Sequence, residues 1–359
     1  MIPIRRFVGL RTAARIQLPP VSASWSRQSY ATRAPPPPPF QTVETCPSPT
    51  CRCAAMPEFP DGLDIDQKSN LNGVISGYAE QVLICTGKDD WTSKIEDENS
   101  GDNLAADLKE LFGRGGKYTD PFHNVSVLNA SMPSTPSPRE GLQSSSAYLF
   151  PSFKYIPHLP RVSFEHVDAL AKAYILPEKL HSAHDGLSPI HRDRLTRSEA
   201  YQNLLVGVQD VQDVLVLICG HGGRDARCGI IGPVLRDEFE AKLASQGFDV
   251  LLGPVQVGND GLHKIEGEES HTERKPAARV GLISHIGGHK FAGNVIVYIP
   301  PTMKTPAGEK HPLAGHGIWY GRVEPQNVEG LVAETVMKGN VVAEKFRGGI
   351  DSQRRILRI

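Results

Sequence analysis

Residues 213–228 read DVLVLICGHGGRDARC in this chain of 359 residues. The first six residues form a near-continuous apolar run, which is typical of a strand that is covered on both faces of its sheet. This strand delivers Cys219 at its carboxyl end, and a glycine-rich turn leads from there to Cys228. The stretch therefore predicts an α/β fold in which a buried central strand presents a thiol at one edge of the sheet.

A second glycine-rich turn, His285-Ile-Gly-Gly-His289, follows another apolar run at 279–284. The glycines between the two histidines argue against the helix that a zinc protease uses, and no Glu follows His285. Two thiols and two imidazoles, each pair in a turn beside a strand, suit a four-point metal site. Because soft thiolates favour zinc or iron–sulfur clusters and imidazole suits both, we predict that Cys219, Cys228, His285 and His289 bind metal.

Charged side chains accompany both turns. A metal would require each cysteine as a thiolate, and Arg224 and Arg227 inside the cysteine turn are expected to lower the thiol pKa values. Lys290 and Arg322 are candidates for tuning the site, although ordinary surface charge is the simpler interpretation.

The elements around these turns predict a thioredoxin-like unit. Strands are predicted at 213–218, 248–257, 279–284, 294–299 and 318–323, with one helix beginning at Pro233 and a last helix capped by Asn327. An opening strand, a helix, a group of strands and a closing helix follow one another in the order of such a unit.

The first half carries a similar pattern. It predicts strands at 81–85, 123–128 and 148–156, a helix capped by Asp102 and a second helix capped by Ser163. Both halves begin with an apolar run that ends in Ile-Cys, at Cys85 and Cys219. This similarity raises the hypothesis that the N-terminal lobe is a degenerate copy without a site, in which Cys85 is a core residue.

The first 43 residues predict a mitochondrial presequence. They contain six arginines and no Asp or Glu before Glu44, and the prolines at 35–39 form a stiff spacer. We expect a mitochondrial protein, in the matrix rather than the intermembrane space. The chain is then divided into the presequence and spacer at 1–43, an N-terminal α/β lobe at 44–176, a linker at 177–197, a thioredoxin-like domain at 198–345 and a basic tail at 346–359.

Composition excludes several classes of protein. The formal net charge of -1 lacks the basic footprint of a nucleic-acid-binding protein. No apolar run approaches the ~20 residues of a membrane helix, so no membrane span is expected. Six cysteines are too few and too unevenly spaced for a disulfide scaffold, which favours a reducing compartment.

Three of the cysteines, Cys46, Cys51 and Cys53, lie in the segment CPSPTCRC. Three thiols within eight residues can bind metal or form a redox pair, but no fourth ligand lies near them and the surrounding Pro and Ser residues indicate a flexible segment. A thiol oxidoreductase that uses these cysteines is one alternative function.

The motifs resemble the sucrase/ferredoxin-like family, and in particular its mitochondrial branch. The resemblance extends from about residue 44 to the end, and it rests on the patterns C-x8-C and H-x-G-G-H with their flanking runs LVLICGHGGRDARCGIIGP, HIGGHKFAGNVIVYIP and GIWYGRVEP. It implies a C-terminal thioredoxin-like ferredoxin domain with a [2Fe-2S] cluster. Carried over by position, Cys219, Cys228, His285 and His289 occupy the ligand places.

The resemblance also implies a role in electron transfer or in thiol and redox homeostasis, with redox partner proteins that are unknown. No paired carboxylates form a glycosidase dyad, so a hydrolase is not expected. Two other interpretations of the four ligands stay open. They can form a structural zinc module, because two cysteines and two histidines are also a common zinc set, or they can be core residues without a ligand.

Charge counting predicts the redox behaviour of such a cluster. A diferric core carries two positive charges and two thiolates neutralise them, whereas four thiolates would leave two negative charges. The potential is therefore expected above the value of about -400 mV of plant-type ferredoxins. A histidine ligand has a second ring nitrogen that can bind a proton on reduction, so the potential is expected to depend on pH.

Overall fold

The computed structural model describes residues 38–99, 101–257 and 275–359. The predicted transit peptide and the first prolines of the spacer lie outside these residues, as does most of the predicted loop at 258–278. From Pro38 onward the described residues form one compact unit, and Phe40 is already buried. Within these ranges, no helix combines the length and the apolar character that crossing a bilayer requires.

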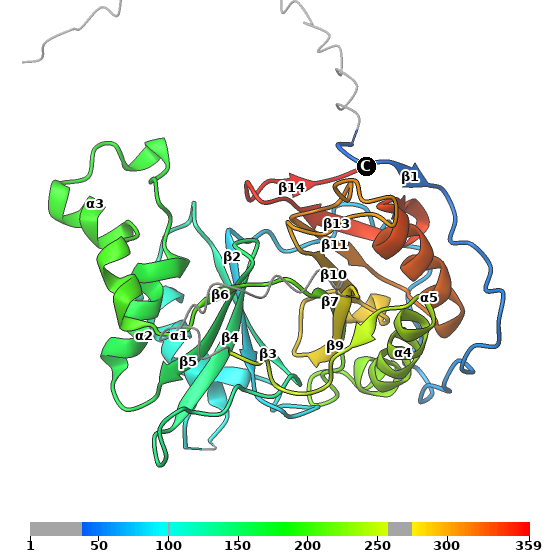
Figure 1. Ribbon diagram of the computed structural model, residues 1–359, viewed down its shortest axis with the longest axis horizontal. Coiled ribbons are helices and arrows are strands. Elements are labelled where there is room, and N and C mark those ends of the chain that lie inside the picture. Colours follow the sequence, from blue (N-terminus) through cyan, green and yellow to red (C-terminus); the bar gives the residue numbers. More distant parts are fainter. Residues whose placement is uncertain (1–37, 100, 258–274) are drawn as a thin grey trace, which may run out of the picture. The chain divides into compact units, whose positions relative to one another are not determined.

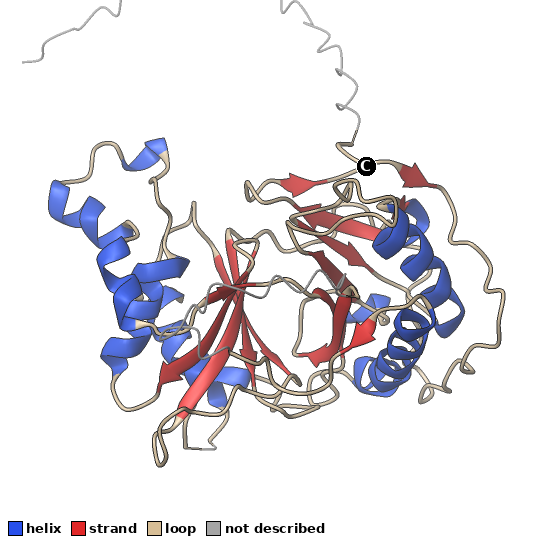
Figure 2. Ribbon diagram, viewed as in Figure 1, coloured by secondary structure: helices blue, strands red, loops and turns tan. Residues whose placement is uncertain are grey.

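A mixed sheet of twelve strands runs through both halves, which confirms the predicted α/β class (Figures 1 and 2). Eleven strands follow one another across it: β14 (Ile356–Leu357), β13 (Phe346–Ile350), β11 (His316–Tyr320), β10 (Val295–Ile299), β7 (Val214–Cys219), β9 (Ala277–Ile283), β3 (Val125–Ala130), β2 (Glu80–Cys85), β4 (Ser144–Phe150), β5 (Lys154–Pro160) and β6 (Gln209–Asp210). β8 (Asp249–Val250) pairs with β9. A separate small sheet joins β1 (Thr42–Val43) to β12 (Val341–Val342).

The described residues contain five α-helices: α1 (Leu104–Phe112), α2 (Phe164–Leu170), α3 (Pro189–Leu195), α4 (Ala226–Ser245) and α5 (Pro325–Leu331). α1, α2 and α4 pack against strands of the sheet, whereas Leu195 is the one buried residue of α3. α1 packs against α2 in the first half, and α4 packs against α5 in the second (Figure 1). Both α2 and α5 continue as a π-helical turn, Ala171–Ile175 and Val332–Lys338.

One unit of strand, helix, three strands and helix occurs twice. It is β2, α1, β3, β4, β5 and α2 in the first half, and β7, α4, β9, β10, β11 and α5 in the second. In each unit the first strand pairs in parallel with the second and antiparallel with the third, which pairs antiparallel with the fourth. The two units meet where Ala130 of β3 pairs with Ile283 of β9. The repeated topology supports the hypothesis of a duplicated unit.

The buried strands follow the predicted pattern. All six residues of β7 are buried, as are all six of β2, including Cys85. The predicted strands at 279–284 and 294–299 correspond to β9 and β10, and Ser163 caps α2 by accepting a hydrogen bond from the backbone of Glu165. Alternation and apolar runs predict these elements because burial on both faces of a sheet requires them.

Several predicted boundaries are wrong. Asn103, not Asp102, caps α1, because Asp102 instead accepts hydrogen bonds from Arg161. The predicted strand at 148–156 instead comprises the end of β4, a turn at 151–153 and the start of β5, since Pro151 lacks the backbone N–H that a continuous strand needs. Only Asp249–Val250 of the run at 248–257 forms a strand.

Four further differences concern the linker and the second half. The long helix begins at Ala226, seven residues before the predicted start at Pro233, and Glu324 rather than Asn327 caps α5. Residues 346–359, predicted to be a basic tail, instead contribute β13 and β14, and every residue of β13 is buried. The linker predicted at 177–197 contains α3 and a short 3-10 turn, Ser182–His184.

The segment 40–75, which we call the N-terminal strap, packs against the second half rather than the first. β1 pairs in parallel with β12, the backbone N–H of Asp66 donates to Lys290, and the backbone N–H of Gly73 donates to Arg347. In Figure 1 this segment passes along α5 and α4. The sequence analysis assigned most of this segment to the N-terminal lobe. The residues that it contacts lie more than 200 positions later in the sequence, so a single sequence gives no sign of these contacts.

Candidate metal centre

The two predicted cysteine ligands lie at the junction of β7 and α4. Cys219 is the last residue of β7, and Cys228 is the third residue of α4. The helix begins early because Asp225 accepts a hydrogen bond from the backbone N–H of Arg227, at 3.1 Å. Both thiols are fully buried, and the first turn of a helix favours an anion such as a thiolate.

The two buried thiols affect each other's pKa values. Interaction with Cys228, and then with His285, holds the pKa of Cys219 below its ordinary value. Interaction with Cys219 and burial raise the pKa of Cys228. The two thiols therefore lose their protons as one coupled pair.

The histidine turn follows β9 and brings two imidazoles beside this pair. Gly287 and Gly288 have φ of 78° and 68°, a left-handed conformation that side chains other than glycine rarely adopt. The turn returns the chain so that the rings of His285 and His289 lie 5.3 Å apart. His285 is half-buried next to Cys219, and His289 is exposed.

The four predicted ligands thus approach one another in pairs. Cys219 interacts electrostatically with Cys228 and with His285, and the ring of His285 lies beside that of His289. Across the described ranges, no group of three or more Cys, His, Asp or Glu side chains converges on a single metal position. The Nδ1 atom of His285 is buried and has no hydrogen-bond partner among the described atoms.

His221, which the sequence analysis missed, connects the cysteine turn to the histidine turn. It is 1% exposed, and its Nδ1 accepts a hydrogen bond of 3.1 Å from the backbone N–H of His285. Its Nε2 then carries the proton and faces the carbonyl oxygens of Trp91 and Thr92, at 3.1 and 2.9 Å. His221 therefore holds the histidine turn in place, and its position two residues after Cys219 was the available signal.

Arg347 is the second missed residue, and it belongs to β13. Its guanidinium is 1% exposed and donates to the oxygens of Val74 at 2.9 Å, Asn294 at 2.6 Å and Gly287 at 3.3 Å. It has no ion pair with any carboxylate in the described part of the chain. Burial lowers its pKa to about 10, and the charges of the two ligand cysteines oppose this effect.

The four cations that the sequence analysis named near the site interact with other side chains. Arg227 pairs with Asp225 at 2.9 Å, and Arg224 donates to the hydroxyl of Ser93. Lys290 pairs with Asp66 of the N-terminal strap at 2.8 Å, and Arg322 binds the same residue. Arg347, by contrast, is a buried cation without a carboxylate partner among the described residues, and its pKa responds to both cysteines.

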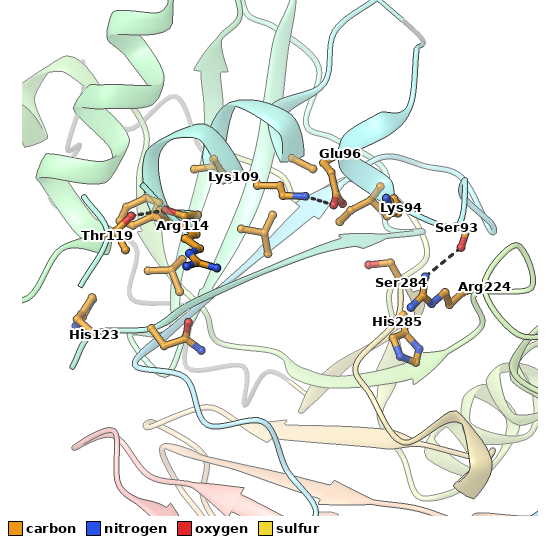
Figure 3. A pocket seen from close by; sticks show the side chains of 18 of the residues that line it. Ser93, Lys94, Glu96, Lys109, Arg114, Thr119, His123, Arg224, Ser284 and His285 are labelled. Atoms are coloured by element: carbon orange, nitrogen blue, oxygen red, sulfur yellow. Dashed lines mark hydrogen bonds and ion pairs between the residues drawn. The ribbon is translucent and has the colours of Figure 1, made fainter. Parts of the chain in front are cut away.

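A cavity of about 740 Å³ opens beside the histidine turn. Figure 3 shows Ser284, His285 and Arg224 at one end and His123 and Thr119 at the other. Residues of α1 and β3 from the first half complete its lining. The cavity reaches the side chain of His285, so this ligand is approachable from the first half of the chain.

The cysteines of the N-terminal strap lie elsewhere. Cys46, Cys51 and Cys53 pack against α4 and α5, near Lys242 in the last turn of α4, whereas Cys228 is in its first turn. Fourteen residues of helix separate those two positions, which is about 21 Å. The three strap cysteines therefore take no part in the metal centre, and Cys85 is a core residue as predicted.

Comparisons with known proteins agree with these features. The sucrase/ferredoxin-like family model matches residues 71–348. Altered inheritance of mitochondria protein 32 of Debaryomyces hansenii is 30% identical over 316 residues, which cover 86% of this chain and 96% of that protein. The protein of the same name from Meyerozyma guilliermondii is 28% identical over 324 residues, covering 86% and 95%. No solved structure matches. Because the family model spans most of its length, the chain belongs to the sucrase/ferredoxin-like family.

Proposed function

We propose that this chain is a mitochondrial [2Fe-2S] protein whose second half is a thioredoxin-like ferredoxin domain that acts in electron transfer or thiol and redox homeostasis. One observation carries the proposal. The fold places two fully buried cysteines at the junction of β7 and α4, and interaction with His285 lowers the pKa of Cys219 although 66 positions separate these two residues in the sequence. The mitochondrial assignment is supported by the composition of residues 1–43 and by the names of the relatives.

The donor set fits such a cluster. Two thiols and two imidazoles are the ligand types of a mixed cysteine and histidine cluster, and a buried ring nitrogen of His285 lacks a partner among the described atoms. Among the described residues the four side chains do not converge on one position, so their arrangement does not distinguish a cluster from a single zinc ion.

The chain supplies different environments to the two kinds of ligand. Cys219 and Cys228 are fully buried, whereas His289 is exposed and His285 lines the cavity. A bound cluster would supply reversible one-electron chemistry. The exposed imidazole side provides the short path by which an electron and a proton can reach a partner, while the buried sulfur side excludes water.

Anaerobic purification tests the proposal. The full chain is expected to absorb in the visible range, to lose this colour with dithionite, and to give an electron paramagnetic resonance signal from two irons per chain after reduction. Replacing Cys219 or Cys228 by serine should abolish the iron content. Cys85→Ala provides the control, because Cys85 occupies the equivalent strand end in the first half and should leave iron binding unchanged.

The alternative of a structural zinc module gives a different result. A colourless protein that contains one zinc ion per chain, and no acid-labile sulfide even after anaerobic reconstitution with iron and sulfide, would overturn the cluster assignment. Iron bound equally by the Cys219→Ser variant would overturn the ligand assignment.

A further inference from the structure

We propose that Cys51 and Cys53 of the N-terminal strap form a second redox site, which exchanges disulfides with a thiol or disulfide partner and is organised by Lys242 and Glu329. The site lies where the strap crosses α4 and α5, at the opposite end of α4 from Cys228. It does not depend on the metal centre for any of its contacts.

The side chain of Cys51 lies between a cation and an anion. Its Sγ is 2.6 Å from the Nζ of Lys242 and 3.0 Å from the Oε2 of Glu329. Lys242 also pairs with Glu329 at 3.3 Å and with Glu238 at 3.4 Å. The sulfur of Cys51 therefore has an ammonium group in direct contact, and Glu329 positions both the cysteine and the lysine.

Lys242 is unusual because it is a lysine with only 5% exposure. The contact with Cys51 is the largest of the interactions that raise its pKa, so its positive charge is retained. Hydrogen bonds from Cys51 and Thr50 lower the pKa of Glu329 to about 2, so its carboxylate is ionised at neutral pH. Burying a charge of this kind costs free energy unless nearby groups pair with it.

The three strap cysteines have distinct environments. Cys51 is exposed and Cys53 is half-buried, and the Sγ of Cys53 is 3.5 Å from the carbonyl oxygen of Cys51. Burial raises the pKa of Cys53, which keeps it protonated until a partner is attached. Cys46 donates to the carbonyl of Asn327, and burial raises its pKa to about 11, which removes it from the reaction.

The exchange balances without an added oxidant. The sulfur of Cys51 attacks one sulfur of a partner disulfide, whose S–S bond breaks as a mixed disulfide forms, and the proton of the Cys51 thiol passes to the departing partner thiolate. Cys53 then attacks the sulfur of Cys51, and its proton goes to the departing thiolate. The products are a Cys51–Cys53 disulfide and a partner with two thiols. A disulfide across one intervening residue is strained and easily reduced, which suits exchange rather than structure.

Glutathione disulfide is the first probe. Added to the full reduced chain at pH 7, it should produce the Cys51–Cys53 disulfide. Trypsin cuts after Arg52, so mass spectrometry would detect two peptides joined by this bond. Cys53→Ser should stop the reaction at the mixed disulfide on Cys51. A disulfide-bonded unfolded protein as the second probe distinguishes a protein partner, if it reacts faster, from a small disulfide.

Lys242→Gln is expected to slow modification of Cys51 about tenfold, and Lys242→Arg should restore most of the rate because the charge is kept. Cys46→Ser is the matched control and should react like the wild type. Equal rates in Lys242→Gln and wild type, with both chains shown by thermal unfolding to be folded, would overturn the role of the lysine. Failure of Cys53→Ser to accumulate a mixed disulfide would overturn the site. The same rates in metal-free and metal-loaded protein separate this proposal from the cluster.

Discussion

Arg347 offers the sharpest test of how the fold would tune the metal centre. Its cation is buried beside the histidine turn and has no carboxylate partner in the described chain. Burial lowers its pKa to about 10, which corresponds to a cost of about 3 kcal/mol for keeping the charge. Adding an electron to a neutral cluster creates a negative charge, so the same buried cation should favour the reduced state.

The expected effect of Arg347→Met follows from Coulomb's law. For an assumed separation of about 8 Å between the guanidinium and the added electron, Coulomb's law gives about 2 kcal/mol at an effective dielectric constant of about 20. Because about 1.4 kcal/mol corresponds to about 59 mV for one electron, the variant should lower the reduction potential by roughly 90 mV. Arg347→Lys keeps the charge and should shift the potential by less than half as much.

Spectroelectrochemical titration under argon measures these potentials. Arg355→Met is the control, because Arg355 lies on the same C-terminal segment but its side chain is 66% exposed and pairs with Asp351. Each variant must first show wild-type iron content and a cooperative unfolding transition. A potential of Arg347→Met within about 15 mV of the wild type, in loaded and folded protein, would refute the electrostatic reasoning and leave Arg347 a structural residue.

Four other predictions follow from the structure. The reduction potential should fall as pH rises between 6 and 9, because imidazole ligands bind protons on reduction, and a flat potential in a pH titration would contradict histidine ligation. His221→Phe should lower iron content several-fold by freeing the backbone N–H of His285, whereas His191→Phe, on an exposed helix, should leave it unchanged in an iron assay. Gly288→Ala should destabilise the chain by about 1–3 kcal/mol in urea unfolding, because a Cβ would lie 2.6 Å from Arg347 and φ is positive; an unchanged midpoint would mean that the turn relaxes. The pKa of Glu329 is lowered to about 2 in the folded chain, so its contribution to stability is present above its unfolded pKa of about 4.3 and is lost as pH falls toward 2. In acid unfolding, Glu329→Gln should therefore lose less stability than the wild type between pH 5 and pH 2.

Local sequence patterns were sufficient for the α/β class and for most buried strands. Apolar runs such as 213–218 predict β7 because a strand covered on both faces has no polar positions. The four candidate ligands could be named because cysteine and histidine carry their chemistry as single residues, and their binding of a metal stays a prediction. Boundaries were less certain, since caps such as Asn103 and Asp225 depend on hydrogen bonds that similar neighbouring residues can also make.

Only the tertiary structure decided which distant residues surround these elements. Arg347 lies almost sixty residues after the histidine turn, in the segment that its basic residues led us to predict as a tail. It is buried because β13 pairs with β11. Lys242 and Cys51 are 191 positions apart and meet because the N-terminal strap crosses α4. Such contacts leave no periodic signal in a single sequence, because they depend on how the strands pair and how the strap packs. The candidate ligands and the apolar pattern of the strands, in contrast, can be recognised from individual residues and their neighbours.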